Sequence, residues 1–139
     1  MWRSLISANF SICLWVCRSA DVSGGICAFD LGGWDAGVFL DLWDNLWVMG
    51  SPGPELRTFF PANTWVYIVV TRSGSAVKLY ANGVIRTSLN VSGVLNASNK
   101  ALVIGNATHQ AGFFRGNMAD FRLYKDVIID GTVIPNGPW

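Results

Sequence analysis

The sequence predicts an all-β domain, folded as an antiparallel β-sandwich or jelly roll. Fifteen glycines and five prolines interrupt short apolar runs, and no apolar stripe keeps helical spacing over three turns. Nine or ten strand-like runs share 139 residues, which is typical of sandwiches and jelly rolls. The length suits one domain, so we expect a single domain over residues 1–139.

The predicted strands are the apolar runs between turn residues. They cover residues 9–17, 26–31, 36–43, 46–50, 65–72, 76–82, 84–90, 101–105 and 117–124, with a tail strand near 127–134. Asn82-Gly83 predicts a type I′ hairpin, because both residues accept positive φ angles. Asp44-Asn45 and Ser73-Gly74-Ser75 predict two further turns. Two prolines between Ser51 and Pro54 predict a surface loop over residues 51–63.

Side-chain alternation predicts which strand faces are buried. In residues 117–124 the inward set is Ala119, Phe121 and Leu123, and the outward set is Asp120, Arg122 and Tyr124. Residues 10–17 are apolar on both faces, with Phe10, Ile12, Leu14 and Val16 opposite Cys13, Trp15 and Cys17. Such a strand is either central and covered on both sides, or part of a contact outside the domain.

The composition excludes several classes of protein. A hydrophobic fraction of 51% with seven tryptophans excludes a disordered chain. A net charge of +1 excludes nucleic-acid binding by bulk electrostatics, and no run reaches the ~20 apolar residues of a membrane helix. Only 14% of residues are charged, against about 25% in an average domain. We therefore expect part of the surface to face another protein or a ligand.

The N-terminus and the cysteines point to neither targeting nor a metal. Residues 1–20 have the basic start and apolar run of a signal peptide, but Asn9 and Ser11 interrupt the run, so we interpret it as a strand. Cys13, Cys17 and Cys27 are expected to be reduced, buried thiols, although Cys17 and Cys27 could also face each other across a turn. His109 is the single histidine, which excludes a zinc site of the Cys/His kind.

Five runs share their order and spacing with a known family. They are Phe10–Val16, Thr64–Arg72, Val77–Val84, Ala101–Gly105 and Phe114–Tyr124. Together they resemble laminin G-like domains of the concanavalin A-like jelly-roll superfamily over roughly residues 10–124. The resemblance implies a concanavalin A-like jelly roll. The family usually has a further strand before the position of Phe10, so a shortened sandwich would expose an edge strand here.

The acidic residues do not fit a catalytic site. The superfamily includes glucanases, which would need two carboxylates about 5–5.5 Å apart for retaining hydrolysis. Glu55 is the single glutamate, and Asp41 and Asp44 are three apart, which places them on opposite faces of a strand. His109 has no Gly-x-Ser-x-Gly partner motif. We therefore expect no enzyme activity.

Calcium is the cofactor that the resemblance suggests, because many relatives bind it through loop carboxylates and carbonyls. The aspartates near turns are Asp30, Asp35, Asp41 and Asp44. No dense Asp-x-Asp run joins them, and we interpret them as turn-capping residues. No cofactor is expected, and calcium stays open as the alternative.

Tryptophans near turns are the candidate contact residues. The set that combines aromatic faces with hydrogen-bonding groups is Trp34, Asp35, Trp43, Asp44, Asn45 and Trp47. The set would suit either a sugar ring or a subunit interface, and its three tryptophans could also belong to the core. Trp2 and Trp139 are further candidate interface residues, whereas Trp15 and Trp65 are expected in the core because of their strand positions.

Two functions remain. The first is a non-enzymatic structural or adhesion module that assembles into a homo-oligomer or a larger particle with coat proteins, such as a viral (phage) capsid decoration or tail component. The alternative is a carbohydrate-binding lectin module that recognises cell-surface glycans. Both place the protein outside the cell or on a virion surface, with no nucleic-acid partner and no membrane insertion.

Overall fold

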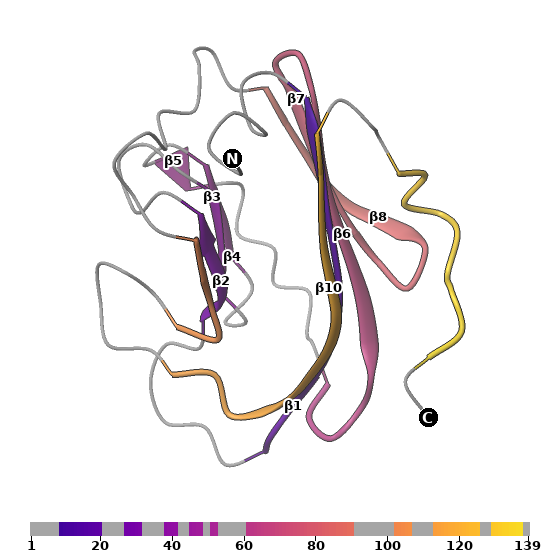
Figure 1. Ribbon diagram of the computed structural model, residues 1–139. Coiled ribbons are helices and arrows are strands. Elements are labelled where there is room, and N and C mark those ends of the chain that lie inside the picture. The colour runs from indigo at the N-terminus through magenta and orange to yellow at the C-terminus, as the bar shows by residue number, and fades with distance from the viewer. Residues whose placement is uncertain are drawn as a thin grey trace.

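The computed structural model confirms the predicted all-β sandwich, with two five-stranded antiparallel sheets face to face (Figure 1). The structure describes residues 9–20, 27–31, 38–41, 45–48, 51–52, 61–90, 102–106, 113–125 and 129–137. Within these residues the secondary structure consists of strands and turns, with no helix. The sequence pattern therefore identified the fold class correctly.

The first sheet has the order β10-β1-β6-β7-β8, and the second has the order β5-β4-β3-β2-β9. The strands are β1 (Phe10–Arg18), β2 (Cys27–Leu31), β3 (Val38–Asp41), β4 (Asn45–Val48), β5 (Ser51–Pro52), β6 (Val66–Ser73), β7 (Ala76–Ala81), β8 (Val84–Asn90), β9 (Leu102–Ile104) and β10 (Gly116–Lys125). Each strand predicted between residues 9 and 124 is present, with its ends within two residues of the prediction. Asn82 and Gly83 both have positive φ, which confirms the predicted hairpin.

The core lies on the inner face of the first sheet. On β1 it comprises Phe10, Ile12, Leu14 and Val16, each at most 1% exposed. Across the strand pair, Val66, Ile68 and Val70 of β6 lie beside them and are also buried. Burial of each such side chain contributes about 1.5–3 kcal/mol to folding. The other face of β1 is also buried, so this strand is central and covered on both sides.

Residues 129–137, here called the C-terminal strap, cover that other face. Figure 1 shows the strap in yellow along the side of the first sheet that faces away from the second. The predicted tail strand near 127–134 is wrong for the described residues 129–134, which form no strand. Val133 N donates to Asp130 O over 3.1 Å, so the chain turns here instead of extending along a ladder.

Two predictions about the second sheet are also wrong. Ser51 and Pro52 do not belong to a loop but form β5, where they pair with Val48 and Trp47. β5 is an edge strand, where the missing N–H of a proline can face away from the ladder. The chain does turn back between β3 and β4, which pair antiparallel as predicted, but Asn45 is wrongly placed in that turn, because it opens β4 opposite Asp41.

A β-bulge in β10 overturns part of the predicted alternation. Cys13 pairs with Arg122, whereas Trp15 pairs with Ala119, so two residues of β10 stand opposite one residue of β1. Asp120, within the bulge, has a φ of 54°. Because of the extra residue, the alternation before the bulge is out of step with the alternation after it, and Ala119 lies on the strap side of the sheet rather than with Leu123.

Candidate functional site

The strap side of the first sheet carries a second apolar layer, which we call the outer layer. Its buried members are Cys13, Trp15, Tyr67 and Val69, and the partly buried side chains packed against them are Trp65, Tyr80, Ala119, Tyr124 and Ile129. The ring centroids of Trp15 and Tyr67 lie 5.1 Å apart with the ring planes tilted by 43°, within the favourable range for aromatic pairs. The layer therefore concentrates aromatic side chains on one sheet face.

The Cys13 thiol and the Tyr67 hydroxyl, both in the buried part of the outer layer, stay uncharged at neutral pH. Burial raises the pKa of the Cys13 thiol, and the hydrogen bond with Tyr67 opposes that change. Burial and the same hydrogen bond both raise the pKa of Tyr67. Cys13 and Cys17 are free thiols; Cys13 is buried, as predicted, whereas Cys17 is only half-buried. The side chain of Cys27 lies outside the described residues.

Hydrogen bonds hold the strap on this face. Ile129 N donates to Ser11 Oγ over 2.9 Å. Asp130 Oδ1 accepts from Thr132 N at 2.9 Å and from Thr132 Oγ1 at 2.7 Å. Both bonds lower the pKa of Asp130, and the bond from the Thr132 side chain has the larger effect. The start of the strap is therefore fixed both to β1 and within itself.

Two glycines let the strap approach the sheet. A Cβ at Gly131 would overlap the ring of Tyr80, and a Cβ at Gly83 would lie 2.8 Å from the carbonyl oxygen of Thr132. The side chain of Ile134 lies 3.3 Å from the same Gly83 position. The strap thus crosses the sheet at Tyr80 and meets the β7–β8 hairpin at Gly83.

The first opening beneath the strap is an aromatic cleft of about 620 Å³. Its lining consists of Trp15, Trp65, Asn82, Ile134, Pro135, Asn136 and Gly137. Tyr67 fixes Asn82 in place, because Tyr67 N donates to Asn82 Oδ1 and Asn82 N donates to Tyr67 O, both over 2.8 Å. Asn82 Nδ2 makes no hydrogen bond to any residue that the structure describes. The cleft therefore sets amide donors beside indole rings, a combination suited to neutral hydroxylated ligands.

The second opening, the polar cleft, has a volume of about 490 Å³ on the opposite side of the strap crossing. Its lining consists of Thr71, Ser73, Ala76, Lys78, Tyr80, Ile129, Asp130 and Gly131. It contains three hydroxyl groups, one ammonium group and one carboxylate. Such a lining suits a polar ligand.

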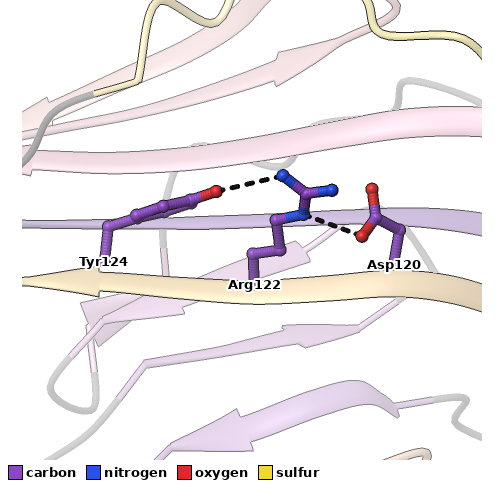
Figure 2. A network of polar contacts seen from close by, with 3 residues as sticks. All are labelled: Asp120, Arg122 and Tyr124. Atoms are coloured by element: carbon purple, nitrogen blue, oxygen red, sulfur yellow. Dashed lines mark hydrogen bonds and ion pairs between the residues drawn. The ribbon is translucent and has the colours of Figure 1, made fainter.

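A polar network stands on the edge strand β10 (Figure 2). Arg122 Nε donates to Asp120 Oδ1 over 2.7 Å, and Arg122 Nη1 donates to the Tyr124 hydroxyl over 3.4 Å. The bond with Asp120, followed by that with Tyr124, raises the pKa of Arg122. The side chains of Arg122 and Asp120 are 57% and 41% exposed. Charged groups and a bulge on an edge strand discourage pairing with another sheet, so we assign the network to edge protection.

Most of the site residues predicted from sequence are not among those that the structure describes. Trp34, Asp35, Trp43, Asp44, Trp2 and Trp139 lie outside the described residues. Asn45 and Trp47 stand on β4, opposite Asp41 and Phe39. The aromatic cleft was missed, because Trp15 and Trp65 were assigned to the core; Trp15 is buried and Trp65 half-buried, yet both line the cleft. The available signal was the second apolar face of residues 10–17.

The described residues contain neither a metal-ligand cluster nor a membrane-spanning helix. Within them, no three His, Cys, Asp or Glu side chains come together as metal ligands. The same residues contain no helix with the length and apolarity needed to cross a membrane.

Comparisons with known proteins place the chain in a family. A laminin G family model, described as the concanavalin A-like lectin/glucanases superfamily, matches residues 3–133. The resemblance seen in the sequence is confirmed and extends over more of the chain. A search of curated proteins found no match.

Solved structures share the fold at low identity. Domain 4 of the extracellular arabinanase AbnA from Geobacillus stearothermophilus, in complex with arabinotriose, has a TM-score of 0.74 and 20% identity over 91% of this chain and 65% of that chain. A heptameric pentraxin from Limulus polyphemus has a TM-score of 0.60 and 14% identity over 91% and 69%. The carbohydrate-binding module CBM66 from Bacillus subtilis has a TM-score of 0.50 and 12% identity over 84% and 66%. This chain thus spans just under two-thirds of the arabinanase domain.

Proposed function

The chain belongs to the concanavalin A-like lectin/glucanases superfamily, and we propose that it is a carbohydrate-binding module whose sugar site is the aromatic cleft. The observation that carries the proposal is the placement of Trp65 and Asn82 in one opening of about 620 Å³. A sugar ring has apolar faces that stack on an indole and hydroxyls that exchange hydrogen bonds with an amide. Both kinds of contact are available there.

Two of the structural relatives support this choice. The arabinanase domain is in complex with arabinotriose, and the Bacillus subtilis relative is a carbohydrate-binding module. We therefore take arabinotriose as the first probe. We further propose that residues 1–139 act as one domain outside the cell.

We propose binding without cleavage. Glycoside hydrolysis uses a pair of carboxylates that flank the bond to be broken. The two acidic side chains that the structure describes, Asp120 and Asp130, are held by Arg122 and Thr132. Neither lines the aromatic cleft, so neither is placed to act on a sugar bound there.

Replacing Trp65 with alanine should weaken sugar binding about tenfold or more, because stacking on an aromatic ring and the area it buries are both lost. The measurement is isothermal titration calorimetry with arabinotriose and a panel of xylo-, gluco- and galacto-oligosaccharides. Asn136→Ala, which alters the exposed strap wall of the cleft, should weaken the same ligand without affecting the core.

Phe113→Ala is the matched control, since Phe113 is 71% exposed and lines neither cleft. Trp34→Ala and Trp47→Ala test the site that the sequence predicted, formed by Trp34, Asp35, Trp43, Asp44, Asn45 and Trp47. Loss of binding in those variants, with Trp65→Ala and Asn136→Ala unchanged, would move the site to that set. If the folded protein bound none of the oligosaccharides in the panel, carbohydrate binding itself would be contradicted.

Self-assembly is a second candidate function, favoured by exposed apolar side chains where the strap meets the β7–β8 hairpin. These are Val84, Ile85, Val133 and Ile134, each 48 to 60% exposed. Val84 and Ile85 open β8, an edge strand of the first sheet, and Ile134 lies beside the β7–β8 hairpin at Gly83. Light scattering should then show a species larger than 15.1 kDa that Ile85→Lys dissociates, whereas a stable monomer would exclude assembly. The relatives described above give no support to a viral capsid decoration or tail component.

A further inference from the structure

The polar cleft, formed between β6, β7 and the start of the strap, is not explained by the binding of a neutral sugar in the aromatic cleft. We propose that it is a second sugar site that selects an acidic sugar, a hexuronic acid, through Lys78. This proposal rests on the carbohydrate-binding function proposed above. It concerns a different set of side chains and so can fail separately.

The charges of the cleft are unequally satisfied. Asp130 already accepts two hydrogen bonds from Thr132, at 2.9 and 2.7 Å. Lys78 is a half-buried residue of the same lining, and its ammonium group has no hydrogen-bond or ion-pair partner among the residues that the structure describes. Lys78 is therefore the charged group of the cleft that most needs a partner, and that partner must be an anion. A carboxylate on the ligand would supply that anion.

The remaining polar groups suit the rest of a sugar. Thr71, Ser73 and Tyr80 bring hydroxyl groups that both donate and accept hydrogen bonds. The contact of Gly131 with the Tyr80 ring fixes that ring as one wall. A hexuronic acid has its carboxylate at one end and ring hydroxyls at the other. It can thus place the carboxylate on Lys78 while its hydroxyls donate to Asp130.

The two clefts are separate sites. Between them, Gly131 lies against Tyr80, and Thr132 lies against Gly83. No residue lines both openings. Substitutions at Lys78 should therefore leave the aromatic cleft intact.

The test is an NMR titration of the 15N-labelled protein with glucuronate, glucose and glucosamine, which differ chiefly in charge. Glucuronate should bind most tightly and shift the backbone signals of Thr71, Lys78 and Asp130. Lys78→Gln should weaken glucuronate binding about tenfold or more, as expected for loss of a hydrogen bond to a charged group. Lys125→Gln, which removes an exposed lysine on β10, should leave it unchanged.

Each other outcome overturns the proposal. Tighter binding of glucosamine would make Asp130 the selecting group. Equal binding of glucuronate to the wild type and to Lys78→Gln, or no shift in this cleft, would remove the acidic-sugar site. Arabinotriose binding at Trp65 is measured on the same samples. Binding of arabinotriose or of another oligosaccharide of the panel there would leave the proposed function standing, whereas no binding of any sugar in the panel to the wild type would overturn that function instead.

Discussion

Replacing Gly131 with alanine should lift the C-terminal strap from the sheet and weaken sugar binding in both clefts. The new Cβ would overlap the ring of Tyr80, and that ring cannot retreat because it packs on the buried outer layer. Overpacking of this kind costs about 1–3 kcal/mol. Releasing the strap costs less than compressing the layer, so the strap is the part that should move.

Hydrogen exchange measures this directly. The amides of Ile129, Thr132 and Val133, which donate within the strap and to Ser11, should exchange faster in Gly131→Ala, and calorimetry should show weaker binding. Gly74→Ala is the control for the overlap. Its φ of 59° makes alanine cost about 1–2 kcal/mol, but a Cβ there meets nothing within 4 Å, so the strap should stay in place. Unchanged exchange and unchanged affinity in Gly131→Ala would show that the strap is not a wall of the clefts.

Replacing Gly116 with alanine should cause the largest loss of stability in the set, about 3 kcal/mol or more. Gly116 has a φ of 141°, a conformation that is essentially restricted to glycine. A Cβ would also overlap the carbonyl oxygen of Cys17 and lie 2.9 Å from Cα of Arg18. Both are backbone atoms of β1, the central strand, and they cannot move without breaking its pairing with β10.

Comparing the urea unfolding of Gly116→Ala with that of Gly105→Ala separates the cost of the positive φ from the cost of the overlap with β1. Gly105 also has a positive φ, 79°, but a Cβ there would meet only the Cβ of Phe114, at 3.8 Å. Gly105→Ala should therefore lose only the conformational part, about 1–2 kcal/mol. Similar losses in the two variants would mean that the first sheet can shift at Gly116 to accept a side chain.

The strands were predictable from sequence because local alternation and turn residues determine them. Asn82-Gly83 illustrates this, since its positive φ angles are intrinsic to the dipeptide. The bulge at Asp120 was not predictable, because one extra residue in a ladder leaves the local pattern unchanged while it reverses the faces. The loop predicted at Pro52 was wrong for a similar reason. A strand tolerates proline at a sheet edge, and the local sequence does not show that β5 is an edge strand.

The aromatic cleft could not be predicted, because it forms from segments that are far apart in the sequence and that no local pattern links. Trp15, Trp65 and Asn82 meet through strand pairing, and the strap that completes the opening comes from the end of the chain. Sequence reasoning recognised that residues 10–17 were apolar on both faces. It could not identify the cover, because the strap crosses Tyr80 at Gly131, and a residue without a side chain gives no apolar signal.

The most direct test of carbohydrate binding on the strap side is to map an oligosaccharide that binds in the panel by NMR. The indole N–H signals of Trp15 and Trp65 and the side-chain amide signals of Asn82 and Asn136 should move together along the titration. Movement confined to the signals of Trp34, Trp43 and Trp47, with those four unchanged, would contradict the assignment of the sugar site to the aromatic cleft.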